Sequence, residues 1–203
     1  NQILVQDEQP SFYIYKLSKD SKTQYGVIAS VDINLRSKKY ILPHEKTFTI
    51  KENAILKNIQ ATKTQVGPVY LTYENKNNLK KIFQKYTRIK PEYFFTSSGD
   101  TKHSLWIVNN HRDIKFISSQ LSQIKKLYIA DGHHRFAAIS KLFNKTKIKN
   151  KNIKSVPLLA ALFDQASVKI LSYNRLIKLK KNNSREVLNS IKNNFNDLKL
   201  CKF

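Results

Sequence analysis

The pentapeptide Asp-Gly-His-His-Arg at 131–135 brings together residue types that could hold an anion and act on it. It follows the apolar run LYIA at 127–130 and precedes FAAISKLF at 136–143, which predicts a strand, a tight turn and a helix in that order. The first N–H groups of a helix have no partner within the helix and carry partial positive charge. Such a helix start can bind phosphate or another anion.

Each residue of this turn has a candidate role. Gly132 lets the backbone turn tightly and approach a ligand, while Asp131 can cap the turn or bind a metal. His133, His134 and Arg135 place polar, partly cationic groups where the helix dipole disfavours positive charge unless an anion compensates. The alternative is that Asp131 is a helix cap and the two histidines are exposed polar residues. Two histidines and an arginine are poor capping residues, which favours a binding site for phosphate.

A second polar pair, His44 and Glu45, lies within ILPHEKT at 41–47. Pro43 forces extended backbone on the residue before it, which predicts that the pair lies in a loop or at a strand end. The pair is not part of a zinc-protease helix, because Phe48 stands where the second His of His-Glu-x-x-His would be. His44 is therefore a candidate ligand of a substrate, and the alternative is a solvated pair.

A third polar group, 173–175, falls late in a predicted strand at 169–177. From there Asn174 and Arg175 could reach a ligand at the sheet edge, although a buried ion pair explains Arg175 equally well. The remaining candidates are three histidines that could ligate a metal but match no metal motif: His103, His111 and His133.

The composition narrows the class of protein. A chain of 203 residues can form one or two domains with a real core. Its single Cys excludes an intrachain disulfide framework, and no apolar stretch approaches the ~18 residues of a membrane span. We therefore expect a cytoplasmic protein that is not embedded in a membrane. The lack of Met indicates a fragment of a longer protein, without its N-terminal region and C-terminal end.

The net charge of +23 comes mainly from lysine, since only six of the 37 basic residues are arginine. Nucleic-acid readers favour arginine for bidentate contacts with guanine and phosphate. The lysines are also scattered along the whole chain. We therefore expect nucleic acid to bind weakly, non-specifically and in a salt-sensitive way.

The spacing of apolar residues predicts one domain over 1–203, of the mixed α/β class, with a mixed sheet and flanking helices. Strands are predicted at 12–17, 24–33, 66–73, 103–108, 127–130, 156–163 and 169–177. Helices are predicted over Leu79–Tyr86 after a cap at Asn77 or Asn78, from a cap at Asp113 through Ile124, at 136–143, and from Ser184 with Val187, Leu188, Ile191 and Phe195 facing inward.

Five segments in this order resemble the bacterial and archaeal family called domain of unknown function 1015. They are DEQPSFYIY (7–15), HEKT (44–47), HSLWIV (103–108), LYIADGHHRFAA (127–138) and SYNRLI (172–177). The resemblance runs from residue 4 to the end of the chain. The combination of HE, ADGHHR and YNR makes it specific.

The DGHHR turn is also similar to the DG-x-HR turn of the ParB and sulfiredoxin-like superfamily, which includes CTP-binding partition proteins, sulfiredoxins and free-serine kinases. This resemblance implies a ParB/sulfiredoxin-like core that binds ATP, ADP or CTP. It would place Gly132, His134 and Arg135 on the nucleotide phosphates and Asp131 beside Mg²⁺ or the helix start. It also makes Glu45 the candidate base, as an upstream Glu is in the serine kinases, with His134 as the second catalytic candidate.

Three functions follow from these patterns. The first is a nucleotide-dependent phosphotransferase acting on a small molecule, because phosphoryl transfer needs positioning, cations and one base. The second is a nucleotide-binding, DNA-associated protein of the ParB type. The third is a module that holds an anionic metabolite without turning it over.

Overall fold

The computed structural model describes residues 6–33, 40–74, 78–149, 152, 156–170 and 184–194. The chain divides into two compact units, Asn1–Lys169 and Ile170–Phe203, and each is described by itself. The prediction of one domain therefore stays a prediction. Among the described residues, no helix has both the length and the apolar character needed to cross a membrane.

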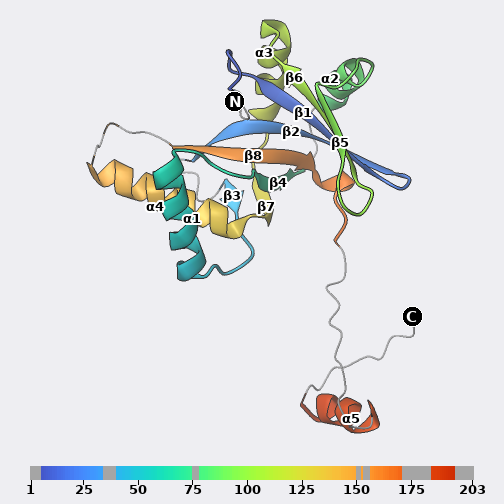
Figure 1. Ribbon diagram of the computed structural model, residues 1–203, viewed down its shortest axis with the longest axis vertical. Helices are drawn as coiled ribbons and strands as arrows, with labels where there is room; N and C mark the ends of the chain where they lie inside the picture. Colours follow the sequence, from blue (N-terminus) through green and yellow to red (C-terminus); the bar gives the residue numbers. More distant parts are fainter. Residues whose placement is uncertain are drawn as a thin grey trace. The chain divides into compact units, whose positions relative to one another are not determined.

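One mixed sheet runs through the first unit (Figure 1), with the strand order β3-β7-β4-β8-β2-β1-β6-β5 among the described residues. Its two parallel pairs are β3 with β7 and β4 with β8, and the other neighbours are antiparallel. The strands are β1 Phe12–Lys19, β2 Lys22–Ile33, β3 Ile41–Leu42, β4 Val69–Tyr73, β5 Tyr93–Thr96, β6 Lys102–Val108, β7 Leu127–Asp131 and β8 Val156–Asp164. The predicted mixed α/β class is confirmed.

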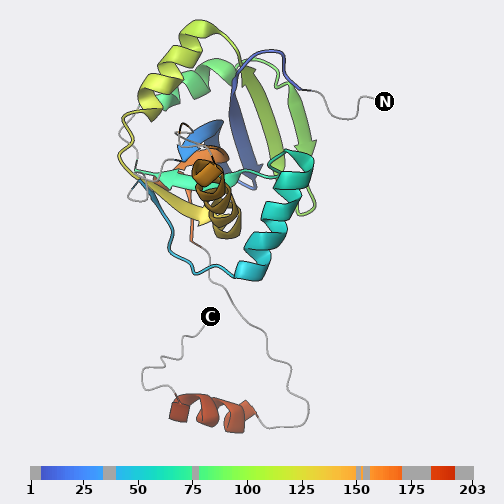
Figure 2. The ribbon, with the colours of Figure 1, turned by 90° about the vertical axis from the view of Figure 1, so that its left-hand side faces the viewer.

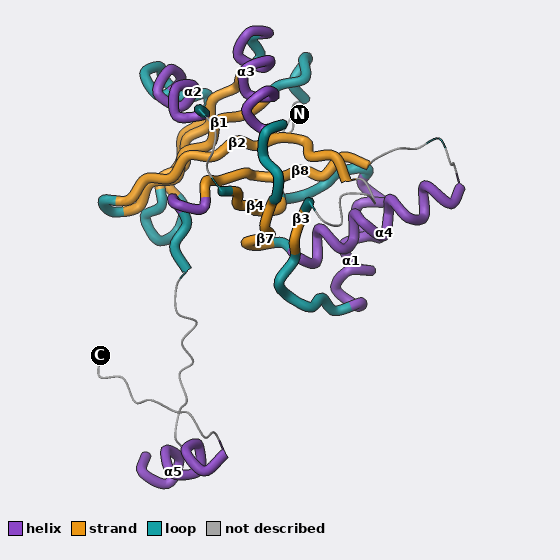
Figure 3. The backbone as a smooth tube through the Cα atoms, turned by 180° about the vertical axis from the view of Figure 1, so that it is seen from behind, coloured by secondary structure: helices purple, strands orange, loops and turns teal. Residues whose placement is uncertain are grey.

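The helices of the first unit form two pairs. Helix α1 (Thr49–Thr62) packs against α4 (His133–Lys149), and α2 (Leu79–Tyr86) packs against α3 (His111–Leu121). In Figure 2, α1 runs beside α4, and α2 and α3 lie together over another part of the sheet. A short 3-10 helix, η2, spans Gln165–Ser167. Seen from behind, β3 and β7 lead toward the pair of α1 and α4 (Figure 3), so this pair bounds the ends of those two strands.

The core lies between the sheet and these helices. The central strands are apolar on their buried positions, and Ile14, Val27, Leu71 and Leu158 are fully buried. Strand β4 is buried at four of its five positions, so this central strand is covered on both faces. The sheet is therefore a rigid base for the strand ends that carry the polar motifs.

Helix α1 and strand β5 were not predicted from the sequence, and neither were the two-residue strand β3 and the short helix η2. Only Glu52 and Leu56 of α1 are buried, so the helix has no continuous apolar stripe to reveal it. All four residues of β5 are exposed, so this edge strand has no alternation of buried and exposed positions. Periodicity detects an element through its buried face, and neither α1 nor β5 has a regular one.

The N-caps of α2 and α3 differ in part from those predicted. Asn78 is the N-cap of α2, but its side chain makes no capping hydrogen bond. The predicted Asp113 cap of α3 is wrong, because the Asn110 side chain accepts hydrogen bonds from the backbone N–H groups of Arg112 and Asp113, at 3.0 and 3.3 Å. An Asn at the N-cap leaves the later acidic residue free to point into the protein.

The second unit contains α5 (Ser184–Asn194), which begins at Ser184 as predicted. None of its residues is buried within the second unit, so the inward position predicted for Val187, Leu188 and Ile191 stays a prediction, and Phe195 lies outside the described residues. The predicted strand at 169–177 also falls mainly outside them.

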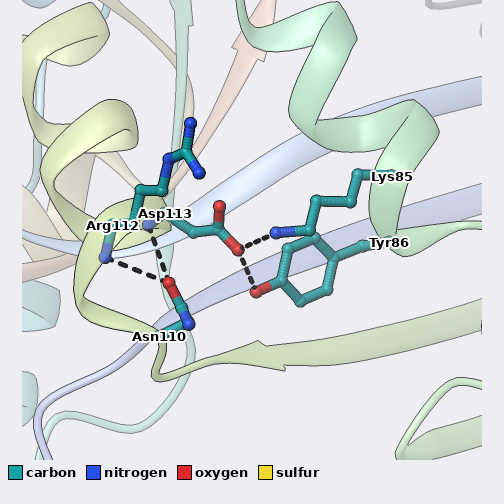
Figure 4. A network of polar contacts seen from close by, with 5 residues as sticks. All are labelled: Lys85, Tyr86, Asn110, Arg112 and Asp113. Carbon is teal, nitrogen blue, oxygen red and sulfur yellow. Dashed lines mark hydrogen bonds and ion pairs between the residues drawn. The ribbon is translucent and has the colours of Figure 1, made fainter.

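Asp113 instead links α3 to α2 (Figure 4). Its Oδ2 accepts hydrogen bonds from Lys85 Nζ at 2.6 Å and from Tyr86 Oη at 2.8 Å. Burial would raise the pKa of Asp113, but the hydrogen bonds from Lys85 and Tyr86 outweigh it and hold this pKa below its usual value. Burial and the bond to Asp113 raise the pKa of Tyr86. The buried carboxylate therefore fixes the two helices together.

We expect Asp113→Ala to lower the free energy of unfolding by about 2–3 kcal/mol, because it leaves the buried Tyr86 hydroxyl without its partner. Lys85→Ala should cost less than about 1 kcal/mol, since the Lys85 side chain is 59% exposed. Urea unfolding at pH 7 measures both. Equal losses in the two variants would contradict this role for Asp113.

Candidate functional site

The predicted strand, turn and helix are present at 131–135. Strand β7 ends at Asp131, Gly132 has a φ of +94°, and α4 begins at His133. The backbone N–H of Phe136 donates to the Gly132 carbonyl at 2.9 Å, which is the first turn of the helix. The three N–H groups before Phe136 are therefore those that a helix cannot pair internally. They lie where the sequence predicts an anion.

The Arg135 side chain folds back over this turn. Its Nη2 lies 2.7 Å from Asp131 Oδ2, an ion pair between residues four apart. A Cβ at Gly132 would stand 2.9 Å from Arg135 Nε and Nη2, and one at Gly67, with a φ of +77°, would stand 3.2 Å from Nη1. Two glycines in the left-handed region thus leave room for the guanidinium.

The sheet brings Gly67 to this position. Strand β4 starts just after Gly67 and Pro68, and it pairs antiparallel with β7, so that Tyr70 lies opposite Asp131. The end of β7 and the start of β4 are therefore neighbours. The predicted Asp131 cap is replaced by a carboxylate that holds Arg135 across the turn.

The His44 and Glu45 pair lies at the same place. Both residues follow β3, which is parallel to β7, so the two strands end at one edge of the sheet. Glu45 Oε2 lies 3.2 Å from His133 Nδ1, and the rings of His44 and His133 meet edge to face with centroids 4.5 Å apart. The structure thus brings the two motifs together, although Glu45 and Asp131 are 86 residues apart in the sequence.

His133 is the buried member of this group, with a side chain only 3% exposed. Burial lowers the pKa of His133 below its usual 6.5, the neighbouring His44 lowers it further, and Glu45 opposes the change. A neutral ring whose Nδ1 faces a carboxylate carries its proton on Nδ1 and leaves a lone pair on Nε2. A neutral His133 with its proton on Nδ1 can therefore donate to Glu45 and orient it.

Two polar atoms of the turn are buried without a partner. Within the part of the chain that the structure describes, His133 Nε2 and Arg135 Nε have no hydrogen-bond partner. Buried polar groups are usually paired, and an exception marks strain or a missing ligand. The turn is therefore incompletely satisfied by the protein's own atoms.

His134 contacts Phe48, the N-cap residue of α1. Its Nε2 accepts a hydrogen bond from the backbone N–H of Phe48 at 3.1 Å, and its ring stacks on the Phe48 ring. With Nε2 occupied as an acceptor, a neutral His134 carries its proton on Nδ1. His134 can then offer a ligand one N–H donor.

A partly buried ion pair between α1 and α4 holds the two helices in place. Glu52, buried in α1, binds Lys141 of α4 and the Thr47 hydroxyl. Hydrogen bonds from Lys141 and Thr47 lower the pKa of Glu52 against the opposing effect of burial. This contact fixes the start of α1 beside α4, so that the loop with Glu45 stays next to the turn.

The turn at 131–135, Glu45 and part of α1 line an open cleft of about 540 Å³. Such a volume is in the range of small-molecule sites. Two elements form its walls, the turn with the start of α4 and the loop with the start of α1. The lining residues are Glu45, Lys51, Ala54, Ile55, Asp131, Gly132, His133, His134 and Arg135.

Other predicted residues do not join the cleft. His103 lies on β6, where Nδ1 is 2.6 Å from Tyr15 Oη and Nε2 is 3.0 Å from Ser97 Oγ. His111 begins α3. Asn174 and Arg175 lie outside the described residues. No group of three or more His, Cys, Asp or Glu within the described ranges could hold a metal, so a Mg²⁺ at Asp131 stays a prediction.

Sequence reasoning missed part of the site. Lys51, Ala54 and Ile55 come from α1, which periodicity does not reveal. The sequence places Gly67 only within the predicted strand at 66–73. Its positive φ and its place beside Arg135 depend on the pairing of β4 with β7, which no local pattern indicates.

The family model described as Protein of unknown function (DUF1015) matches residues 1–199. The chain belongs to this DUF1015 family. The predicted resemblance is confirmed, and the match spans the HE, ADGHHR and YNR motifs. Comparison with curated proteins and with solved structures found no match.

We expect the free energy of unfolding to fall as the pH drops below 6.5, and the protonation of His133 to account for part of this loss. Folding lowers the pKa of His133, so the unfolded chain binds more protons just below the ordinary histidine value, and stability is lost as the pH falls toward the folded pKa. His133→Asn keeps an N–H near Glu45 but cannot titrate. Urea unfolding between about pH 7.5 and about pH 5 should show a shallower pH dependence in His133→Asn.

His111→Asn, at the exposed start of α3, is the control for removing a histidine elsewhere. A pH dependence in His133→Asn equal to that of the unaltered protein would contradict the assignment.

Proposed function

We propose that this DUF1015 protein is a nucleotide-dependent phosphotransferase that acts on a small molecule. One observation carries the proposal: the α4 N-terminus, the Arg135 guanidinium and the Glu45 carboxylate line the same cleft. The helix N-terminus can bind an anion, the guanidinium can supply a cation for the transferring phosphoryl group, and the carboxylate can act as a base.

The phosphates would lie against the start of α4. Its unpaired backbone N–H groups and the helix dipole favour negative charge. The Arg135 guanidinium lies against the same turn, and the unpartnered Nε adds to the capacity of the turn for an anion. His134 would add an N–H from Nδ1. The bound group would be ATP, ADP or CTP, with Asp131 as the candidate ligand of an accompanying Mg²⁺.

Glu45 would act as the base that takes the proton of the acceptor molecule. Its side chain is 59% exposed, and one carboxylate oxygen lies 3.2 Å from His133 Nδ1, which leaves the other oxygen for an acceptor hydroxyl. In the transfer, the acceptor oxygen bonds to the terminal phosphorus of the nucleotide, and the bond from that phosphorus to its bridging oxygen breaks. Glu45 takes the hydroxyl proton, and the nucleotide leaves one phosphate shorter.

His133 has another task in this scheme. Its side chain is only 3% exposed, and its Nδ1 lies 3.2 Å from Glu45 Oε2. It would therefore act as a positioning residue for the base. His44 packs edge to face on the same ring and stays a candidate ligand of the substrate, as do Asn174 and Arg175.

A nucleotide-binding, DNA-associated protein is the second candidate, supported by the net charge of +23. Non-specific contacts between lysine and phosphate weaken by orders of magnitude as salt rises to about 200 mM. Specific duplex binding that survives this salt would favour the second candidate over the enzyme.

We expect Arg135→Ala to weaken ATP binding by about tenfold to a hundredfold in calorimetry with Mg²⁺, because it removes the charge next to the phosphates. Glu45→Gln should keep this affinity but lower ADP formation about 10²–10⁴-fold in assays with a panel of free amino acids and small alcohols. Arg88→Ala is a charge-matched control at an exposed residue that does not line the cleft.

ATP binding that Arg135→Ala leaves unchanged would contradict the proposed phosphate site. Binding of ATP without turnover of any acceptor would favour a module that only holds an anionic metabolite.

A further inference from the structure

We propose that a second cavity, beside the cleft, takes the base of the nucleotide whose phosphates lie at the start of α4. This inference rests on the proposed function. The second cavity has a volume of about 300 Å³ and lies between α1, the loop before β4 and the first turns of α4. We call it the apolar cavity. It is lined mainly by Ile55, Asn58, Ile59, Val66, Arg135 and Ile139.

The apolar cavity adjoins the cleft. Ile55 and Arg135 line both. Successive turns of α1 form a wall of both spaces. Lys51 lines the cleft, and Ile59 lines the apolar cavity. With a rise of 1.5 Å per residue, these two positions are about 12 Å apart along the helix. A ligand that fills both spaces is therefore elongated, with a charged end and an apolar end.

The walls of the apolar cavity suit a flat ring. Ile59, Val66 and Ile139 supply aliphatic side chains, and 71% of Val66 is exposed at the rim. Asn58 carries a side-chain amide, which offers both a donor and an acceptor to the edge of a base. An apolar slot with few polar groups is typical of the part of a site that holds a planar ring.

The wall opposite α1 is fixed in advance. Gln65 lies in the loop before β4, and its Nε2 donates to the Pro157 carbonyl at 2.6 Å. Its Oε1 accepts from the backbone N–H of Leu159 at 2.9 Å. These two bonds tie the loop to β8. A preformed wall lowers the cost of ordering the site when a ligand binds.

Arg135 divides the two spaces. Its guanidinium lies against Gly67 on the side of the apolar cavity and against Gly132 on the side of the cleft. A planar guanidinium can bind phosphate with its N–H groups and stack on an aromatic ring with its face. One side chain can therefore contact both the phosphates and the base of a nucleotide. A phosphorylated metabolite without a base would leave the apolar cavity unfilled.

The test compares MgATP with magnesium tripolyphosphate, which carries the phosphates without the base. We expect the unaltered protein to bind MgATP at least about tenfold more tightly in calorimetry at ~200 mM salt, because burying the base adds apolar contact. Asn58→Trp and Val66→Trp, from opposite walls, should reduce the affinity for MgATP to that of tripolyphosphate. Both should leave the affinity for tripolyphosphate unchanged. Lys57→Trp, an exposed neighbour on α1 outside both spaces, is the matched control.

Equal affinities of the unaltered protein for MgATP and tripolyphosphate, both lost in Arg135→Ala, would overturn the base site but leave the phosphate site. MgATP affinity that both tryptophan variants preserve would also overturn it and place the base elsewhere. Absence of binding by either probe would overturn the proposed function and this inference together.

Discussion

The left-handed turn at Gly132 is the constraint on which the rest of the site depends. A φ of +94° lets β7 pass directly into α4, so that the helix starts at the edge of the sheet. The lack of a side chain at Gly132 also lets the Arg135 guanidinium lie against the turn, where Asp131 holds it. Any larger residue would need both a strained backbone and a displaced guanidinium.

The second half of the site depends on long-range pairing. Parallel pairing of β3 with β7 puts Glu45 beside the turn, and antiparallel pairing of β4 with β7 puts Gly67 there. The ion pair of the buried Glu52 with Lys141 then holds α1 against α4. The central strands are buried in the core, so the cleft is built on a rigid base while its polar residues stay at the edge.

The sequence allowed the local parts to be predicted. The turn at 131–135 was clear because a buried strand, a glycine and a helix follow one another within a short segment. The strands at 12–17 and 24–33 were predicted from the spacing of their apolar residues, and they pair as the antiparallel hairpin of β1 and β2. Both features arise from neighbours along the chain.

The parts that failed depend on tertiary structure. Helix α1 is held by Glu52 and Leu56 rather than by an apolar stripe, and a buried Glu carries no signal of its burial in the sequence. The position of Gly67 follows from strand order. The deep burial of His133 beside Glu45 follows from the packing of His44 and the loop after β3.

The central claim is that a nucleotide phosphate binds at the start of α4 between Arg135 and Glu45. A crystal structure of the protein with Mg²⁺ and a non-hydrolysable ATP analogue tests it most directly. The account predicts phosphate oxygens about 2.7–3.2 Å from the backbone N–H groups of His134 and Arg135, with the terminal phosphate next to Glu45. A nucleotide bound at surface lysines, with no phosphate at the start of α4, would contradict it.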